Sequence, residues 1–166
     1  MEATKVAIVT GSSRGIGAET ALLLAKNGYA VCVNYVSNSE SAEHVANQIT
    51  SNGGRSLAVR ANVSSASDVK RLFKTVDAEL GRVSVLVNNS GILMRQCRFD
   101  DISEERFLQV LRTNVIGCFL CSKEAIKRMS IKHGGHPAEV AEAILWLATD
   151  KSSFVTGSFI DTTGGL

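Results

Sequence analysis

The sequence lacks the features that mark several classes of protein. It contains no run of about 18 apolar residues, so we expect no transmembrane span. The first five residues lead directly into an apolar run, without the charged start and long apolar stretch of a secretory signal. No cluster of Lys and Arg stands out, and the net charge is only +2, which argues against nucleic acid as a partner. We therefore expect a cytoplasmic protein that binds neither membranes nor nucleic acid.

Metal-ligating residues are also few. The four cysteines are Cys32, Cys97, Cys118 and Cys121, of which the last two have C-x-x-C spacing inside a helical pattern. No second pair of ligands accompanies them, so we interpret them as a helix face rather than a redox or metal site. His133 and His136 flank a Gly-Gly pair and also lack further ligands. The sequence predicts no metal site.

What the chain does contain fits an ordinary globular domain. It has 166 residues and a mass of 17.7 kDa, with 45% hydrophobic and 20% charged residues. This composition and length allow a substantial core. We expect one domain over residues 1–166.

Short apolar runs alternate with amphipathic helical patterns along the chain. Val6–Val9 is too continuously apolar for a strand with one wet face, so it reads as a strand covered on both sides. Further strands are expected at Ala30–Tyr35, residues 57–59 and Val83–Val87. Strands alternating with helices of ten or so residues predict parallel βαβ units. The predicted fold class is α/β: a Rossmann-like, doubly wound parallel sheet with helices on both faces.

Four helices are expected between these strands and after the last of them. The first covers residues 15–27, and the second follows a capping box formed by Ser37 and Glu40. The third has an apolar stripe from Val69 to Leu80. The fourth runs over about residues 103–129, and its expected inner side comprises Phe107, Val110, Leu111, Cys118 and Cys121.

After Met129 the alternation of strands and helices breaks down. Ile131 to Gly135 leads straight into His136 and Pro137, where Pro137 fits the first turn of another helix. A last strand is expected over residues 154–160, before Thr163-Gly164-Gly165-Leu166.

The segment between the first strand and the first helix is rich in glycine. It reads Thr10-Gly11-Ser12-Ser13-Arg14-Gly15-Ile16-Gly17. Glycines at these points allow a tight turn and a close approach to a pyrophosphate resting on the helix N-terminus. Because the segment lies between a buried strand and a helix, it predicts a dinucleotide site.

The end of the second strand indicates which dinucleotide is preferred. Folds that select NAD place an acid there, about 20 residues after the glycines, to bind the ribose 2′-hydroxyl. Here the strand ends Asn34-Tyr35-Val36, and the next acid is Glu40. Arg14 could pair with a 2′-phosphate through two N–H groups. We predict NADP(H) over NAD(H); the alternative is that Arg14 is only a solvated loop residue.

Four motifs follow one another along the chain. They are T-G-x-x-x-G-I-G at the glycine loop, Asn62-Val63 after the third strand, Asn88-Asn89-Ser90-Gly91 after the fourth, and Thr113-Asn114-Val115 in the long helix. In this order they resemble the motifs of the short-chain dehydrogenase/reductase family. Residues 155–161 with Gly164-Gly165 resemble the family's C-terminal strand. Within the family the sequence is most similar to bacterial 3-oxoacyl-carrier-protein reductases and sugar dehydrogenases.

The resemblance implies an oxidoreductase that moves a hydride between NADP(H) and a small carbonyl or alcohol. It implies a homo-oligomer, a dimer or tetramer, built through the long helices and the C-terminal strand. Asn114 would help to position a water in a proton relay, or would merely cap a helix irregularity. Asn62 would accept a hydrogen bond from the adenine amino group through its amide oxygen. The expected cofactor residues are Gly11, Ser13, Arg14, Gly15, Ile16, Gly17, Asn34, Tyr35, Asn62, Val63, Asn88, Ser90 and Gly91.

The family's catalytic serine and its Tyr-x-x-x-Lys pair have no counterpart in this sequence. The only tyrosines are Tyr29 and Tyr35, and neither has a lysine four residues later. The gap falls between Gly135 and His136, where the family's fifth and sixth strands would lie. Two interpretations remain open. Either the enzyme is complete and its sequence omits an internal segment here, or the protein carries a true deletion. A deletion would leave a catalytically silent NADP-binding protein or an inactive fragment.

Overall fold

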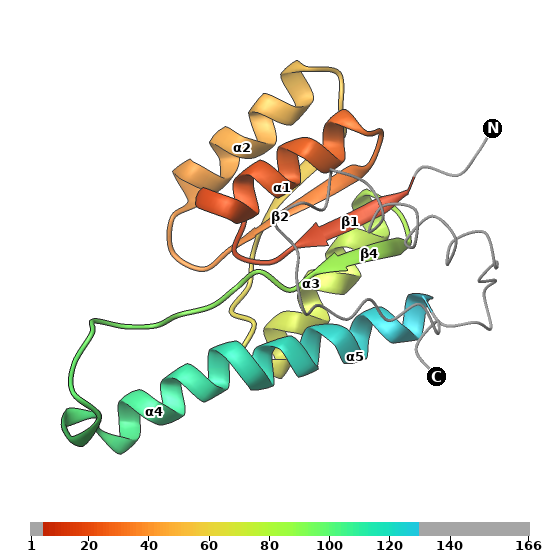
Figure 1. Ribbon diagram of the computed structural model, residues 1–166. Helices are drawn as coiled ribbons and strands as arrows, with labels where there is room; N and C mark the ends of the chain where they lie inside the picture. The colour runs from red at the N-terminus through yellow and green to blue at the C-terminus, as the bar shows by residue number, and fades with distance from the viewer. Residues whose placement is uncertain (1–4, 130–166) are drawn as a thin grey trace, which may run out of the picture. The chain divides into compact units, whose positions relative to one another are not determined.

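The computed structural model describes residues 5–129, which form a parallel sheet and the helices around it (Figure 1). These residues lie almost wholly in one compact unit, Met1–Ala125. The expected junction of Gly135 and His136, the helix at Pro137 and the last strand lie outside the described residues. The strands are β1 (Val6–Val9), β2 (Ala30–Tyr35), β3 (Ser56–Arg60) and β4 (Val83–Val87). The helices are α1 (Gly15–Lys26), α2 (Ser39–Ser51), α3 (Ala66–Glu79), the short 3-10 helix η1 (Phe99–Asp101), α4 (Glu104–Leu111), the π-helix η2 (Arg112–Gly117) and α5 (Cys118–Met129).

The sheet has the order β3-β2-β1-β4, and all its pairs are parallel. Val6 of β1 pairs with Ala30 on one side and Val83 on the other. The chain therefore moves outward from β1 through β2 to β3, and then returns to the opposite side of β1 for β4. Such a switch opens a crevice at the carboxyl ends of the strands, where open α/β sheets bind their ligands.

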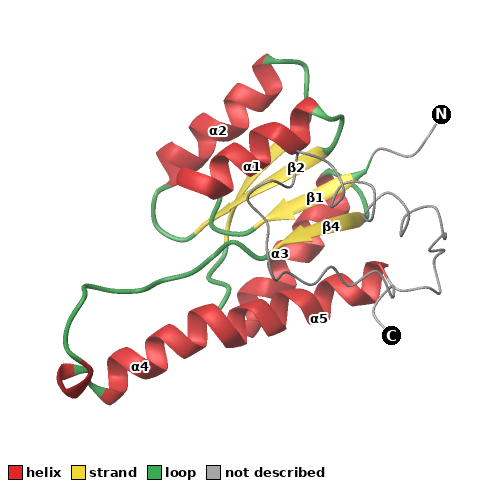
Figure 2. Ribbon diagram, in the orientation of Figure 1, coloured by secondary structure: helices red, strands yellow, loops and turns green. Residues whose placement is uncertain are grey.

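Both faces of the sheet are covered, as the continuous apolar strands predict (Figure 2). Val6 and Ile8 pack with α3 and with Cys121 of α5, whereas Val9 packs with α1 and α2. Successive side chains of a strand point to opposite faces, so one apolar strand contributes to two core layers. This confirms the predicted doubly wound arrangement.

The start of α2 differs by one residue from the predicted capping box. Asn38 is the N-cap, and its side chain accepts a hydrogen bond from the backbone N–H of Ser41 at 2.9 Å. Ser37 is therefore not the cap, so this prediction is wrong. Asn is at least as good a cap as Ser, and Asn38 has the extended backbone that the position requires. The predicted apolar side of α2 is confirmed, since Ala42, Val45, Ala46 and Ile49 are buried.

The long fourth helix is present, but it is not one regular α-helix. The π-helix η2 joins α4 to α5 and widens the turn, which changes the face that the following residues present. Cys118, which follows η2, is therefore exposed rather than on the inner side, contrary to prediction. Phe107, which precedes η2 on α4, is 55% exposed, so its predicted inner position is also wrong. Cys121 is buried there as predicted, with Gly117 and Ala125. Burial, together with the neighbouring Cys118, raises the pKa of the Cys121 thiol to about 12.

Candidate functional site

The glycine loop turns sharply between β1 and α1. Gly11 and Gly15 have φ of 62° and 58°, a region that other residues rarely adopt. Gly17 is required for a different reason, since a Cβ there would lie 2.7 Å from the carbonyl oxygen of Gly11 and against the Asn89 amide. The loop therefore lies close to the end of β4, with the N-terminus of α1 directed at the crevice.

Asn34, at the end of β2, holds this loop against β3. Its side chain is fully buried; Oδ1 accepts from the Gly11 N–H at 3.2 Å, and Nδ2 donates to the carbonyls of Val59 (3.2 Å) and Ala61 (3.0 Å). Ser12 adds two hydrogen bonds between the loop and β2. Its N–H donates to the Asn34 carbonyl at 2.9 Å, and its hydroxyl accepts the Asn34 N–H at 3.1 Å. Asn34, expected among the cofactor residues, thus acts through the shape of the loop, because its amide is already occupied.

The end of β4 is tied to the same loop. Asn89 donates its amide to the carbonyls of Thr10 (2.8 Å) and Gly11 (3.0 Å). The Thr10 hydroxyl accepts the N–H groups of Asn89 (3.0 Å) and Ser90 (2.9 Å). The neighbouring Asn88 donates to the hydroxyl of Ser122 on α5 at 3.1 Å. Sequence reasoning singled out Asn88, Ser90 and Gly91 but missed Asn89 and Thr10, whose only signal was their place inside the two motifs.

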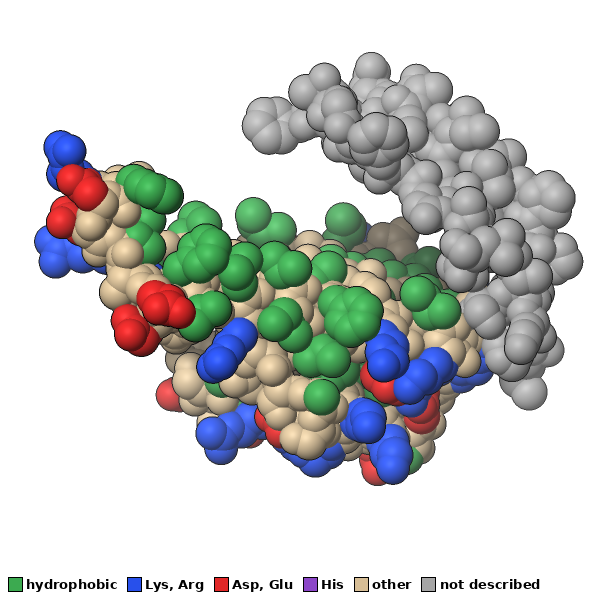
Figure 3. Space-filling model, turned by 90° about the horizontal axis from the view of Figure 1, so that it is seen from below, with side chains coloured by type: hydrophobic (Ala, Val, Ile, Leu, Met, Phe, Trp, Pro, Cys, Tyr) green, Lys and Arg blue, Asp and Glu red, His purple; other side chains and the backbone are tan. Residues whose placement is uncertain are grey.

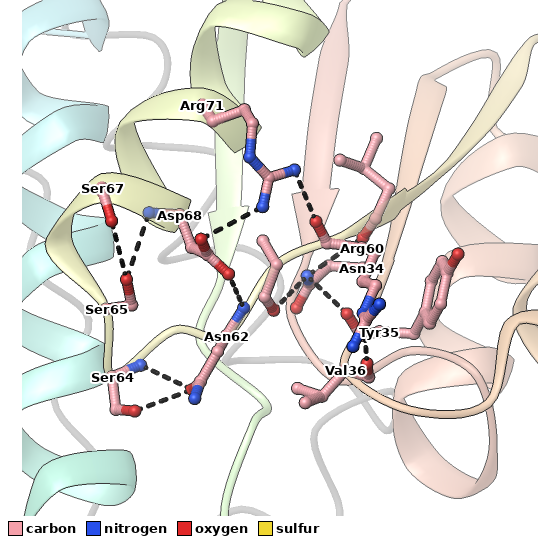
Figure 4. A network of polar contacts seen from close by, with 12 residues as sticks. Asn34, Tyr35, Val36, Arg60, Asn62, Ser64, Ser65, Ser67, Asp68 and Arg71 are labelled. Carbon is pink, nitrogen blue, oxygen red and sulfur yellow. Dashed lines mark hydrogen bonds and ion pairs between the residues drawn. The ribbon is translucent and has the colours of Figure 1, made fainter.

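The exposed part of the loop carries the residues left free for a ligand. Arg14 precedes α1 in an extended conformation and is exposed, as is Ile16 at 80%. Ser13 is half-buried. Tyr35 at the end of β2 is half-buried against the α1–α2 side of the core. Beside it, Arg60 donates from Nε to the carbonyl of Val36 at 3.0 Å, so a cation lies at the end of β2 (Figure 4).

A polar turn follows β3 and leads into α3 (Figure 4). The Asn62 side-chain oxygen accepts two hydrogen bonds from Ser64, from its N–H at 3.0 Å and from its hydroxyl at 2.7 Å. The Asn62 N–H donates to Asp68 at 2.9 Å, and Arg71 forms an ion pair with that carboxylate at 3.1 Å. These two contacts, the N–H first, lower the pKa of Asp68. Val63 is buried beneath the turn.

A cavity of about 500 Å³ opens between this turn and the helix formed by α4 and η2. It is lined by Asn62, Ser64, Glu105, Leu108, Gln109, Arg112 and Thr113. A second cavity, of about 300 Å³, lies at the opposite edge of the sheet beside the start of β3. Only the first adjoins residues that the sequence placed in the site.

Asn114 lies within η2 and faces the chain that follows β4. Its Oδ1 accepts the Ile92 N–H and its Nδ2 donates to the Ile92 carbonyl, both at 2.9 Å. A Cβ on Gly91 would lie 3.6 Å from the same oxygen, an ordinary van der Waals distance, so Gly91 adjoins Asn114 without being required by this contact. Single π-turns within helices are frequent at functional sites. Asn114 thus holds Ile92 through both ends of its amide, using one of its two N–H groups and one of the two lone pairs of Oδ1.

The structure thus brings together most of the predicted site residues at the carboxyl ends of four strands. Across residues 5–129, no group of three or more His, Cys, Asp or Glu side chains could hold a metal ion. No helix in this part of the chain is long and apolar enough to cross a membrane. The arrangement suits an extended ligand with a phosphate near α1 and further groups toward β2 and β3.

Comparison with known proteins agrees with this geometry. Residues 5–141 match the family model described as short chain dehydrogenase. An uncharacterized oxidoreductase, YgfF of Escherichia coli, is 33% identical, and the match covers 96% of this chain and 99% of the relative. The 3-oxoacyl-[acyl-carrier-protein] reductase FabG of Staphylococcus aureus is 42% identical over 135 residues. The crystal structure of a dehydrogenase/reductase from Sinorhizobium meliloti has a TM-score of 0.74 and 34% identity over 77% of this chain.

The chain is shorter than these relatives. It spans 54% of the Staphylococcus aureus reductase and 50% of the Sinorhizobium meliloti structure. The alignment with YgfF extends over 244 positions, whereas the chain has 166 residues, so at least 78 positions have no residue of this chain. The family model matches most of the chain, and the fold agrees with it. The chain therefore belongs to the short-chain dehydrogenase family, whose members are oxidoreductases that use nicotinamide dinucleotides.

Proposed function

We propose that the protein is an NADP(H)-dependent oxidoreductase that transfers a hydride between the nicotinamide and a small carbonyl or alcohol. The observation that carries the cofactor preference is the charge at the end of β2. No acid occurs from Gly11 up to Glu19 or from Ala30 up to Glu40. Arg60 lies at this strand end, and Arg14 lies in the glycine loop, which is hydrogen-bonded to Asn34 through Gly11. A 2′-phosphate would be attracted there, and nothing in these segments would repel it.

The glycine loop supplies the rest of the cofactor site. Gly11, Gly15 and Gly17 let the backbone approach a pyrophosphate at the start of α1. Ser13 and Ile16 would lie along it, and Asn88, Ser90 and Gly91 would support the nicotinamide half beside β4. Asn114 would act beside them by fixing Ile92, and a water that it positions would bond its backbone or the part of its amide that Ile92 does not use.

The family's general acid and base, the Tyr-x-x-x-Lys pair, does not occur among the 166 residues. We propose that a strand, a helix carrying the Tyr-x-x-x-Lys pair, and a further strand belong between Gly135 and His136 in the complete protein. The unmatched positions of the YgfF alignment support this proposal. The 166 residues alone would then bind cofactor without turnover. The alternative is a catalytically silent NADP-binding protein. The absence of the Tyr-x-x-x-Lys pair is equally consistent with it.

We propose that the protein forms a homo-oligomer through the helix made of α4, η2 and α5. Figure 3 shows hydrophobic side chains gathered on one face of the molecule, and large exposed apolar residues lie along this helix. They are Phe107, Leu108, Val115, Ile116 and Phe119. An apolar patch of several side chains on one element is typical of an interaction surface.

Two measurements test the proposed function. The intact mass is expected to exceed 17.7 kDa if an internal segment belongs to the protein, and the enzyme should then oxidise NADPH with small carbonyl substrates. A mass of 17.7 kDa with NADPH binding and no turnover would favour the silent binding protein.

Titration with NADPH and NADH, followed by nicotinamide fluorescence, tests the cofactor preference. Arg14→Gln is expected to weaken NADPH binding about tenfold or more and to leave NADH nearly unchanged, because a charge-assisted pair is lost. Lys74→Gln, which removes an exposed cation from α3, is the matched control. Tighter binding of NADH than NADPH to the unaltered protein would overturn the preference.

A further inference from the structure

The hydrogen-bonding groups that Asn62 leaves free are donors only. Its Oδ1 accepts the Ser64 N–H at 3.0 Å and the Ser64 hydroxyl at 2.7 Å, as the dashed lines in Figure 4 show. A carbonyl oxygen has two lone pairs, so both are used. Within residues 5–129, Nδ2 of this exposed side chain has no hydrogen-bond partner. The amide oxygen that the sequence assigned to the base is therefore occupied, and the side chain presents N–H groups outward.

The turn fixes which end of the amide points outward. If the amide were reversed, Nδ2 would face the Ser64 backbone N–H, which is a donor and cannot rotate to accept. The Asn62 backbone is held as well, because its N–H donates to Asp68 at 2.9 Å and its carbonyl accepts from the Ser65 N–H at 3.0 Å. The orientation thus follows from a backbone group rather than from the preference of one side chain.

The fold places the base of a bound dinucleotide beside this amide. The pyrophosphate belongs at the start of α1 and the ribose at the end of β2. The next strand end beyond the ribose is that of β3, and Asn62 is the first polar side chain after it. The cavity of about 500 Å³ opens at the same place, with Ser64, Leu108 and Thr113 in its lining.

We propose that Asn62 recognises the base as a donor, bonding a ring nitrogen, and gives no acceptor to the 6-amino group of adenine. The inference rests on the proposed function, since it concerns the base of the same cofactor. An asparagine usually reads adenine with both ends of its amide, accepting from the 6-amino group and donating to N7. Ser64 removes the accepting half of that pair. A base with oxygen at position 6 should therefore bind at least as well as adenine.

The test compares NADPH with its analogue that carries hypoxanthine in place of adenine. Dissociation constants come from nicotinamide fluorescence of the full chain. For the unaltered protein the analogue is expected to bind within about threefold of NADPH, or more tightly, because no acceptor favours the amino group. Asn62→Asp should shift the ratio toward adenine by about tenfold. One carboxylate oxygen of that variant would keep the Ser64 N–H while the other accepts from the 6-amino group and repels a 6-oxygen.

Two further variants separate this effect from a general disturbance of the turn. Ser64→Ala keeps the backbone N–H but frees one lone pair of the Asn62 oxygen, so it should also shift the ratio toward adenine. Ser67→Ala, which removes a hydroxyl lying 3.0 Å from that of Ser65, should leave the ratio unchanged. A tenfold preference of the unaltered protein for NADPH, or an unchanged ratio in Asn62→Asp, would overturn the inference alone. Failure to bind any dinucleotide would overturn the proposed function together with it.

Discussion

At the scale of single residues, Asn34 shows how one amide joins three parts of the chain. It must accept from Gly11 and donate to Val59 and Ala61 at the same time, from a fully buried position. Only a side chain with both an acceptor and two donors meets this requirement. Leu has neither, and an ionised Asp of the same shape has acceptors only. The residue shapes the glycine loop without being free to contact a ligand.

Asn34→Asp should therefore be strongly destabilising although it preserves the shape of the side chain. At pH 7 a buried carboxylate would face two carbonyl oxygens, and we expect the free energy of unfolding to fall by about 3 kcal/mol or more. Burial would raise the pKa of the new carboxyl in the folded state. The loss should thus be smaller at pH 5, where protonation lets the group donate, and should grow as the pH rises.

The measurement is urea unfolding at both pH values, with Asn38→Asp as the control. Asn38 caps α2 from an exposed position, where Asp and Asn are nearly equivalent, so its stability should change by less than about 0.5 kcal/mol. An Asn34→Asp variant no less stable than this control would show that the loop does not depend on the amide.

Much of the site at this scale follows from the sequence, but the hydrogen-bond partners do not. The glycines at 11, 15 and 17 were identified because their conformational role depends on local spacing. The motif does not show that Asn89 rather than Asn88 bonds the glycine loop, because the direction of each side chain depends on where β4 ends. The Asn62 oxygen was assigned to the base, whereas the turn that occupies it involves Ser64, two residues later.

At the scale of elements, the start of α3 gathers polar contacts around one carboxylate. Ser65 is the N-cap and accepts from the Asp68 N–H at 3.3 Å, while Asp68 accepts the Asn62 N–H and pairs with Arg71. A negative charge in the first turn also suits the helix dipole. The pKa of Asp68 is lowered as a result, chiefly by the Asn62 N–H and next by Arg71.

Asp68→Ala should lower stability in a pH-dependent way. The folded-state pKa lies below the ordinary value of 3.8, so the unfolded chain binds the proton more readily as the pH falls. The contribution of the carboxylate is then complete above about pH 5 and is lost as the pH falls through the folded-state pKa. We expect a loss of about 1 kcal/mol at pH 7 that narrows at pH 3. Thermal unfolding at pH 7 and pH 3 measures this loss of stability, and Glu43→Ala on α2 is the control. A loss of stability in Asp68→Ala that is equal at the two pH values would contradict the prediction.

The elements themselves were predicted well where periodicity decides them. All four strands and the apolar stripe of α3 follow from patterns of buried residues, since each is covered on both faces or on one continuous side. The π-helix η2 was not predicted, because its six residues fit the same apolar pattern as an α-helix. What marks it is the pairing of Asn114 with Ile92, a contact across 22 residues that no local pattern reveals.

At the scale of the whole molecule, the side chains of the neighbouring strands β1 and β4 differ in burial. The side chains of β1 are all buried, whereas Val85, Leu86 and Val87 of β4 are only half-buried. In the described part of the chain, β4 pairs with β1 alone. A further strand and helix beside β4 would cover these side chains. This agrees with the proposal that a segment belongs between Gly135 and His136.

The apolar residues of the long helix allow the proposed self-association to be tested. Phe119 is 61% exposed, and the Nζ of Lys123 lies 6.0 Å from the centre of its ring. If a second copy covers this side chain, Phe119→Glu should shift the protein toward the monomer by at least tenfold in dissociation constant, because a buried charge would replace apolar contact. Sedimentation equilibrium over a range of concentrations measures the shift, and Lys70→Glu on the exposed side of α3 is the control.

The same variant distinguishes a second copy from cover provided within one chain. A contact between copies makes the melting temperature depend on protein concentration, and Phe119→Glu should abolish that dependence while leaving the dilute protein nearly as stable as before. Cover within the chain would instead give a large loss of stability at every concentration and no change in mass. That result, or a monomeric parent protein, would contradict self-association through this helix and would assign its apolar residues to the intramolecular core.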